Sequence, residues 1–287
     1  MDSLLDSPFV PTVAACVVAG LLLSLLARLT RALWLAGLVA PVVFLASYYE
    51  TYNKIPAFPP AGSTNKIFYV VLAATLAGLV FDLLAPPRIA AGAVRWVVLL
   101  AASLLIVVWI GLPRFADAAP ALAVVVAALV AGGTLVLWRL ASVDDAEPAP
   151  LDGPVLLAVL PGVFAPIALF GGSSTSVGLC LGLTAGLAMM ALVNLFAPRR
   201  LGLTAVLGAG CGVLAMVDTI TLITQRIDFL ALAIFLAVLF IGQIGARALL
   251  PQGRINPRVR AIAAGLLAAS PVVVIVVLLF LRHDSPL

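Results

Sequence analysis

Apolar residues fill ten long stretches of this chain, and short polar segments separate them. A helix of about 17–25 apolar residues crosses the hydrocarbon core of a membrane, which is about 30 Å thick. Because lipid offers no hydrogen-bond partners to the backbone, a helix is the structure that such stretches adopt. We expect membrane-spanning helices at Phe9–Ala27, Leu33–Tyr49, Ile67–Ala85, Val94–Leu112, Ala119–Trp138, Val155–Gly171, Val177–Phe196, Leu203–Thr224, Phe229–Leu250 and Ala261–Leu281.

The predicted fold class is therefore all-α, a polytopic integral membrane protein with about ten transmembrane helices. We expect one membrane domain, residues 1–287, in which an acidic, Pro-rich linker at 139–153 separates five helices from five. An odd number of spans would invert the second half, 154–287, relative to the first, 1–138, as in many transporters. A true inverted repeat is one alternative, and two unrelated sets of five helices is the other.

Composition agrees with a membrane protein. Hydrophobic residues make up 64% of the chain and charged residues 10%, whereas soluble domains carry roughly 25% charged residues. The lipid bilayer is then the main partner, and a net charge of +4 spread along the loops gives no sign of nucleic-acid binding. The preference for Arg over Lys, with abundant Ala, Val and Leu, suggests a bacterial protein of the cell inner membrane.

Basic residues indicate the orientation. Linkers that follow odd-numbered helices hold eleven of the sixteen Lys and Arg residues: Arg28, Arg31, Arg88, Arg95, Arg139, Arg199, Arg200, Arg247, Arg254, Arg258 and Arg260. Cytoplasmic loops carry the excess of positive charge, so these linkers are expected in the cytoplasm. Both termini are then predicted to be periplasmic.

Ionisable residues within a membrane span are costly and often mark function. Asp218 is the strongest case, because it lies about six residues from the end of its predicted helix. Thr221 and Gln225 follow at i+3 and i+7 and share its helix face. These three residues are candidates for binding a small solute or an ion. The alternative is a structural hydrogen bond or an ion pair, for example with Arg226.

Two further polar residues lie within predicted spans. Asp82 is near the cytoplasmic end of the third helix, where a structural ion pair is the alternative to a binding role. Gln243 lies in the ninth helix between Gly242 and Gly245, where it either contacts a ligand or joins neighbouring helices by hydrogen bonds.

Conventional catalytic chemistry has no support in the sequence. The three cysteines lie in apolar spans, and neither they nor the single His show metal-ligand spacing, so we expect no metal site, no cofactor and no catalytic residue. Asp144, Asp145 and Asp152 in the central linker are expected to be solvated charges. An enzyme that acts on lipid through these acids is the least favoured alternative.

Two functional hypotheses remain. The first is a secondary transporter or carrier of a small solute or ion, with its site between the halves. The second is a non-catalytic subunit or assembly factor of a larger membrane complex, in which the aromatic, Pro-rich segment Glu50–Lys66 docks a partner. A homodimer is a further possible assembly.

Overall fold

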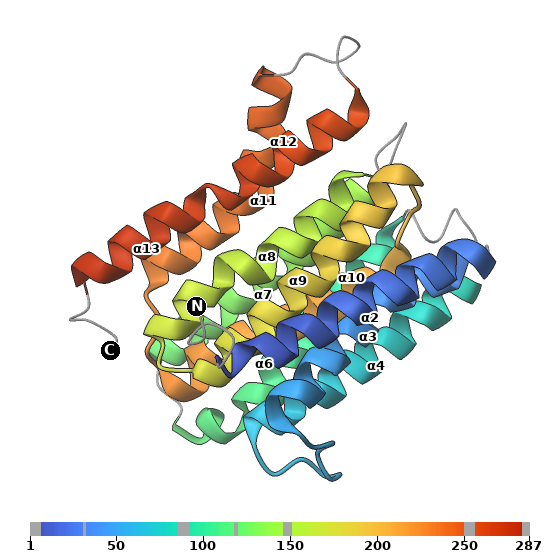
Figure 1. Ribbon diagram of the computed structural model, residues 1–287. Coiled ribbons are helices and arrows are strands. Elements are labelled where there is room, and N and C mark those ends of the chain that lie inside the picture. The colour runs from blue at the N-terminus through green and yellow to red at the C-terminus, as the bar shows by residue number, and fades with distance from the viewer. Residues whose placement is uncertain are drawn as a thin grey trace.

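The computed structural model describes residues 7–30, 33–84, 92–117, 120–145, 151–249 and 256–282. These residues form helices joined by short turns, with no strand among them (Figure 1). Ten of the helical segments are long and apolar enough to cross a membrane. The predicted all-α, multi-pass membrane fold is therefore confirmed.

The helices follow one another closely along the chain. They are α2 (Phe9–Thr30), α3 (Leu33–Tyr52), α4 (Ser63–Leu84), α6 (Ala93–Gly111), the short η1 (Leu112–Asp117), α7 (Pro120–Asp144), α8 (Asp152–Phe170), α9 (Ser174–Phe196), α10 (Gly202–Asp218), the π-helical η2 (Thr219–Thr224), α11 (Phe229–Leu249), α12 (Pro257–Ala269) and α13 (Pro271–Arg282).

Four of the predicted spans, the fifth, sixth, eighth and tenth, differ from the helices in the structure. α7 runs to Asp144, beyond Trp138, and α8 starts at Asp152, so the non-helical part of the expected linker is short. Residues 146–150 of that linker lie outside the described residues. The last span is two helices, because Pro271 has no N–H to continue the helical ladder. The eighth span changes from α-helix to π-helix directly after Asp218.

Helix α10 is the centre of the molecule. It packs against α3, α4, α6, α7 and α8, and every residue from Leu203 to Asp218 is buried. Small residues allow this close packing: a Cβ added at Gly208 would lie 2.6 Å from Cβ of Pro41 in α3. By contrast, α4 holds the corresponding place in the first five helices but presents a face of exposed apolar residues such as Leu76 and Val80.

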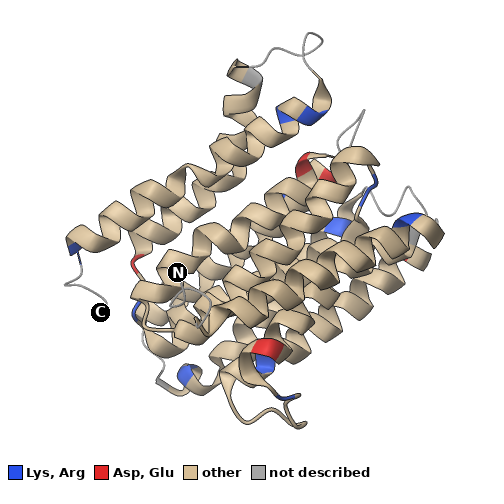
Figure 2. Ribbon diagram, viewed as in Figure 1, with Lys and Arg blue, Asp and Glu red and all other residues tan. Residues whose placement is uncertain are grey.

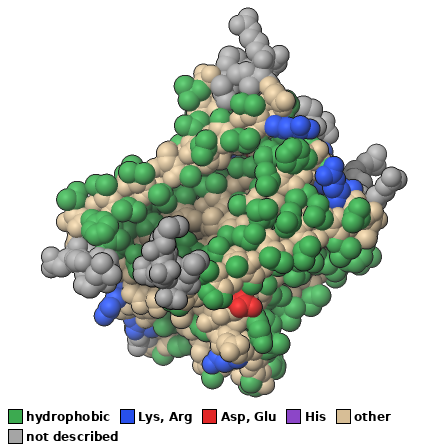
Figure 3. All heavy atoms as spheres, viewed as in Figure 1, with side chains coloured by type: hydrophobic (Ala, Val, Ile, Leu, Met, Phe, Trp, Pro, Cys, Tyr) green, Lys and Arg blue, Asp and Glu red, His purple; other side chains and the backbone are tan. Residues whose placement is uncertain are grey.

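Two further groups of helices surround this centre. α9 packs against α2, α3 and α8, while α11, α12 and α13 form a separate layer that contacts α8 (Figure 1). The outer faces are covered with hydrophobic side chains, as Figure 3 shows for one side of the molecule. Such a surface suits lipid, which solvates apolar side chains as well as other helices do.

Charged residues lie mostly at the two ends of the bundle (Figure 2). We call the end that holds the N-terminus of α10 the arginine-rich end, and the other the distal end. Described basic residues at the arginine-rich end are Arg28, Arg95, Arg139, Arg199, Arg200, Arg258 and Arg260, and those at the distal end are Lys54, Lys66, Arg114, Arg226 and Arg282. Arg31, Arg88 and Arg254 lie outside the described residues.

Candidate functional site

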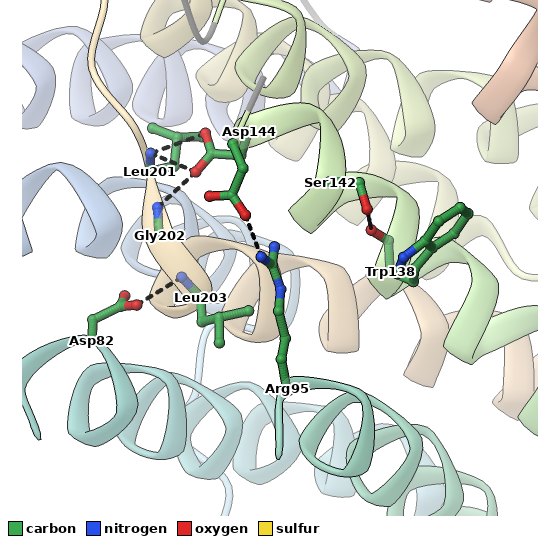
Figure 4. A network of polar contacts seen from close by, with 9 residues as sticks. Asp82, Arg95, Trp138, Ser142, Asp144, Leu201, Gly202 and Leu203 are labelled. Atoms are coloured by element: carbon green, nitrogen blue, oxygen red, sulfur yellow. Dashed lines mark hydrogen bonds and ion pairs between the residues drawn. The ribbon is translucent and has the colours of Figure 1, made fainter. Parts of the chain in front are cut away.

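Asp82 caps the N-terminus of α10 at the arginine-rich end. Its carboxylate accepts a hydrogen bond from the backbone N–H of Leu203 at 3.0 Å (Figure 4). It also accepts from the N–H and the hydroxyl of Thr204 at 2.8 and 2.6 Å. The first N–H groups of a helix have no partner within it, and the helix dipole favours a negative charge there. These contacts give Asp82 a structural role between α4 and α10.

Asp144 caps the same helix start from the other side. Its carboxylate accepts hydrogen bonds from the N–H of Leu201 at 3.0 Å and of Gly202 at 2.9 Å (Figure 4). The expectation of a solvated linker charge is wrong for Asp144, which is 3% exposed. Its neighbour Asp145 does lie at the surface and pairs with Arg95.

Gln243 belongs to a second polar cluster at the arginine-rich end. Its side-chain carbonyl accepts a hydrogen bond from the Arg139 guanidinium, and its amide donates to Oδ2 of Asp152 at 3.3 Å. Arg139 also donates from Nε to the carbonyl of Leu239 at 3.1 Å. The cluster connects α7, α8 and α11, so the contacts of Gln243 are those of an interhelical hydrogen-bonding residue.

Asp218 lies at the distal end, where α10 changes into the π-helix η2. It is 3% exposed, yet no hydrogen bond or ion pair reaches its carboxylate within the described part of the chain. Short π-helical turns occur frequently at functional sites. The π-turn ends at Gln225, whose φ of 56° is in the left-handed region and whose N–H donates to the carbonyl of Ile220 at 3.0 Å.

Two cavities adjoin at this end of α10. The first, which we call the acid cavity, has a volume of about 190 Å³ and lies between α7, α10 and α11, with Asp218 in its wall. The second, which we call the threonine cavity, has a volume of about 410 Å³, with Thr221 and Gln225 in its wall. Val125 and Phe229 line both cavities, so the two share a border.

The five candidate residues therefore fall into three places. Asp218, Thr221 and Gln225 line the adjoining cavities at the distal end, although the hydroxyl of Thr221 donates to the carbonyl of Val217 at 2.7 Å. Asp82 and Gln243 lie at the arginine-rich end in two separate clusters. The first group borders the larger cavities, whereas Gln243 lines a cavity of about 10 Å³.

Arg114 is a residue of this region that the sequence did not single out. It lies in η1, lines the threonine cavity, and donates from Nε to the carbonyl of Leu222 at 3.1 Å. A lone Arg after an apolar span is typical of a membrane-interface residue, so its sequence position carried no sign of a cavity.

Asp228 is the titratable residue next to these cavities in the loop before α11. Burial acts to raise the pKa of its carboxyl, but hydrogen bonds from the N–H groups of Ala231 and Leu230 and the Arg282 guanidinium lower it by more. The net result is a pKa below the ordinary value of an aspartate. Asp228 and Arg282, whose atoms Oδ2 and Nη1 lie 3.1 Å apart, thus join the start of α11 to the end of α13.

Comparison with known proteins gives no family for this chain. No protein-family model matches the sequence, and no curated protein is significantly similar to it.

Proposed function

We infer that this multi-pass membrane protein is a secondary transporter or carrier of a small solute or ion, acting in a bacterial inner membrane. One observation carries the inference: the buried carboxylate of Asp218 has no described partner and borders a cavity. Structural carboxylates in the same molecule, Asp82 and Asp144, accept several hydrogen bonds each. An acid kept within a membrane without such partners is expected to serve a ligand.

The adjoining cavities support a route for that ligand. The threonine cavity lies beside η2 and η1 at the distal end, and it borders the acid cavity through Val125 and Phe229. A solute that enters by the threonine cavity would meet Gln225 and Thr221 before Asp218. The π-turn between these residues offers a local change of helical geometry, of the kind that opens or closes a site.

The test is flux through the purified protein in proteoliposomes. Uptake of labelled amino acids, sugars, amines and monovalent ions into the vesicles is measured, a readout that also detects exchange without net movement of charge. We expect at least one solute to give a protein-dependent signal that Asp218→Asn abolishes and Glu50→Gln preserves. Glu50 is an exposed acid at the distal end that lies outside both cavities, so Glu50→Gln controls for the loss of one negative charge. Equal signals from both variants, or none from any solute, would contradict the proposal.

A second candidate function is that of a subunit in a membrane complex. The loop between α3 and α4 projects Phe58 and Ile55, which are 75% and 69% exposed. The loop is held in place, because the Tyr69 hydroxyl donates to the carbonyl of Pro56 at 2.7 Å and its ring contacts Phe58. A fixed apolar projection is suited to docking another membrane protein.

Native mass spectrometry of the gently extracted protein tests this second function. A fixed ratio with another membrane protein, lost in Phe58→Ser, would support the subunit. A protein that is found alone or as a homodimer would count against it and favour the carrier.

A further inference from the structure

The acid cavity opens toward lipid. Three of its lining residues, Ala128 of α7 and Phe229 and Ala233 of α11, have exposed side chains on the flank of the bundle. Because these residues belong to membrane-spanning helices, the solvent they meet there is the hydrocarbon of the bilayer. A ligand that dissolves in lipid can thus reach the cavity between α7 and α11.

The lining of the acid cavity combines one acid with apolar side chains. Asp218 is its single ionisable residue, and the rest are Gly, Ala, Val, Leu and Phe side chains, including Phe229 and Phe235. A desolvated metal ion needs several oxygen ligands, such as the six to eight of Ca²⁺. The neighbouring hydroxyls of Thr219 and Thr221 are not in the lining of the acid cavity, and both donate to carbonyls of their own helix at 2.7 Å. The chemistry favours an organic cation over a bare metal ion.

The charge in the wall of the threonine cavity also favours entry of a cation from the bilayer, between α7 and α11. The threonine cavity has the guanidinium group of Arg114 in its wall. A cation that approached Asp218 through that cavity would pass a group of like charge. The lateral opening between α7 and α11 has no charged side chain in its lining apart from Asp218 itself.

We propose that Asp218 binds a lipophilic organic cation, such as an aryl-alkyl ammonium, which enters sideways from the bilayer between α7 and α11. This inference rests on the proposed carrier function and names its substrate class. The ammonium group pairs with the carboxylate, and the apolar body contacts Phe229 and Phe235, whose ring faces attract cations. An unpaired charge is costly in this apolar surrounding, so a proton neutralises Asp218 when the cation is absent. Each cation that binds therefore releases one proton.

Few other titratable groups can contribute to that exchange. Among the described residues, α7 and α11 place no titratable side chain in the acid cavity. On α10 the Cys211 thiol lies two turns before Asp218, and from η1 Arg114 borders the threonine cavity. Asp228, next to the cavities, is paired with Arg282. The cation and the proton thus compete for one carboxylate.

Equilibrium binding of labelled benzyltrimethylammonium to the full protein in phosphatidylcholine nanodiscs tests the proposal. Neopentylbenzene, which has the same shape with carbon in place of the charged nitrogen, is the matched neutral competitor. We expect one cation bound per protein, no displacement by neopentylbenzene, and affinity at least about tenfold weaker in Asp218→Asn than in Glu50→Gln. Because one proton is exchanged for one cation, we expect the affinity for the cation to fall about tenfold for each unit by which the pH is lowered, while the protonated acid predominates. This pH series on the unaltered protein remains informative if Asp218→Asn does not fold.

Three outcomes would overturn the inference: no cation binding, binding that Asp218→Asn leaves unchanged, or displacement by the neutral competitor. Flux of another solute that still depends on Asp218 would then preserve the carrier and reject only the cation. If neither cation binding nor flux that depends on Asp218 is found, both the cation inference and the carrier function are rejected.

Substitutions at the opening test the lateral route. Ala233→Trp should slow association of the cation at least about tenfold, because the indole blocks the gap between α7 and α11. Ala127→Trp is the control, since Ala127 is exposed on α7 but does not line the cavity. Equal association rates in the two variants would reject entry from the bilayer.

Discussion

The acids at the two ends of α10 differ in their hydrogen-bond partners. At the arginine-rich end, Asp82 and Asp144 together accept hydrogen bonds from four successive backbone N–H groups, those of residues 201–204. At the distal end, Asp218 is as buried as Asp144 but borders a cavity and accepts no described hydrogen bond. The first arrangement stabilises a helix start, and the second leaves a charge to be neutralised by something outside the chain.

This difference separates the structural acids at one end of α10 from a candidate binding acid at its other end. Burial alone does not distinguish them, since Asp144 and Asp218 are each 3% exposed. The number of partners and the adjacent space do distinguish them. If the interpretation is right, substitutions at the arginine-rich end lower stability strongly, whereas substitution of Asp218 hardly affects it.

Asp144→Ala should have the largest effect. It leaves the N–H groups of Leu201 and Gly202 buried without an acceptor, and each such group costs about 1–3 kcal/mol. We expect unfolding free energy to fall by about 3 kcal/mol, measured by denaturation in mixed micelles. Asp145→Ala is the matched control, because Asp145 is half-exposed and its pair with Arg95 is a surface ion pair. Similar losses in the two variants would show that the cap is not what Asp144 contributes.

Gly202→Ala should have the next largest effect. Gly202 has a φ of 72°, and a Cβ there would lie 2.5 Å from Oδ2 of Asp82. Strained backbone of this kind costs about 1–3 kcal/mol, and displacement of Asp82 would weaken the cap as well. We expect a loss of about 2 kcal/mol in the same assay. Gly62→Ala, which meets no atom within 4 Å, should change stability little. A neutral result at Gly202 would indicate that the helix start can shift without cost.

The sequence predicted the helices well but not the caps. Ten apolar stretches define ten spans because length and hydropathy suffice for a membrane helix. The starts at Phe9, Leu33 and Phe229 agree with the structure. Pro, Asp and Glu residues follow Asp144 closely, a pattern that predicts a loop there. One signal was available: α10 begins after Leu201 with no Ser, Thr, Asp or Asn at the N-cap, so its N–H groups needed an acceptor from elsewhere.

The packing of the helices could not be predicted from the sequence, and the reason is physical. In a soluble protein, the polar face of a helix indicates the side that faces water. Here lipid and protein interior are equally apolar, so a helix such as α10 looks like its neighbours although it is the central one. The separation of Gln243 from Asp218, and the cavities beside Asp218, depend on that packing. They could not be predicted from spacing along single helices.

The ion pair of Asp228 and Arg282 should have a smaller effect. Arg282 is half-exposed, and such pairs contribute about 1 kcal/mol or less. Because the folded-state pKa of Asp228 is below its ordinary value, its contribution is present above that ordinary value, near pH 4, and is lost as pH falls through the folded pKa. We expect Arg282→Gln to reduce this acid-dependent loss, and Lys54→Gln to leave it unchanged, in melting curves between pH 3 and pH 7. Identical pH profiles would show that Arg282 does not set the pKa.

Asp218→Asn should have the smallest effect on stability, a change of less than about 0.5 kcal/mol, because no described hydrogen bond is lost and the side chain keeps its size. Asp218→Leu should raise stability, since it removes a buried polar group and fills part of the adjacent 190 Å³ cavity. Both follow if the acid is retained for a ligand rather than for folding. A loss as large as that in Asp144→Ala would mean that Asp218 stabilises the helix end, and the contrast between the two ends would fail. A neutral change in stability combined with lost cation binding would instead place ligand recognition at the distal end of α10 and helix stabilisation at the other.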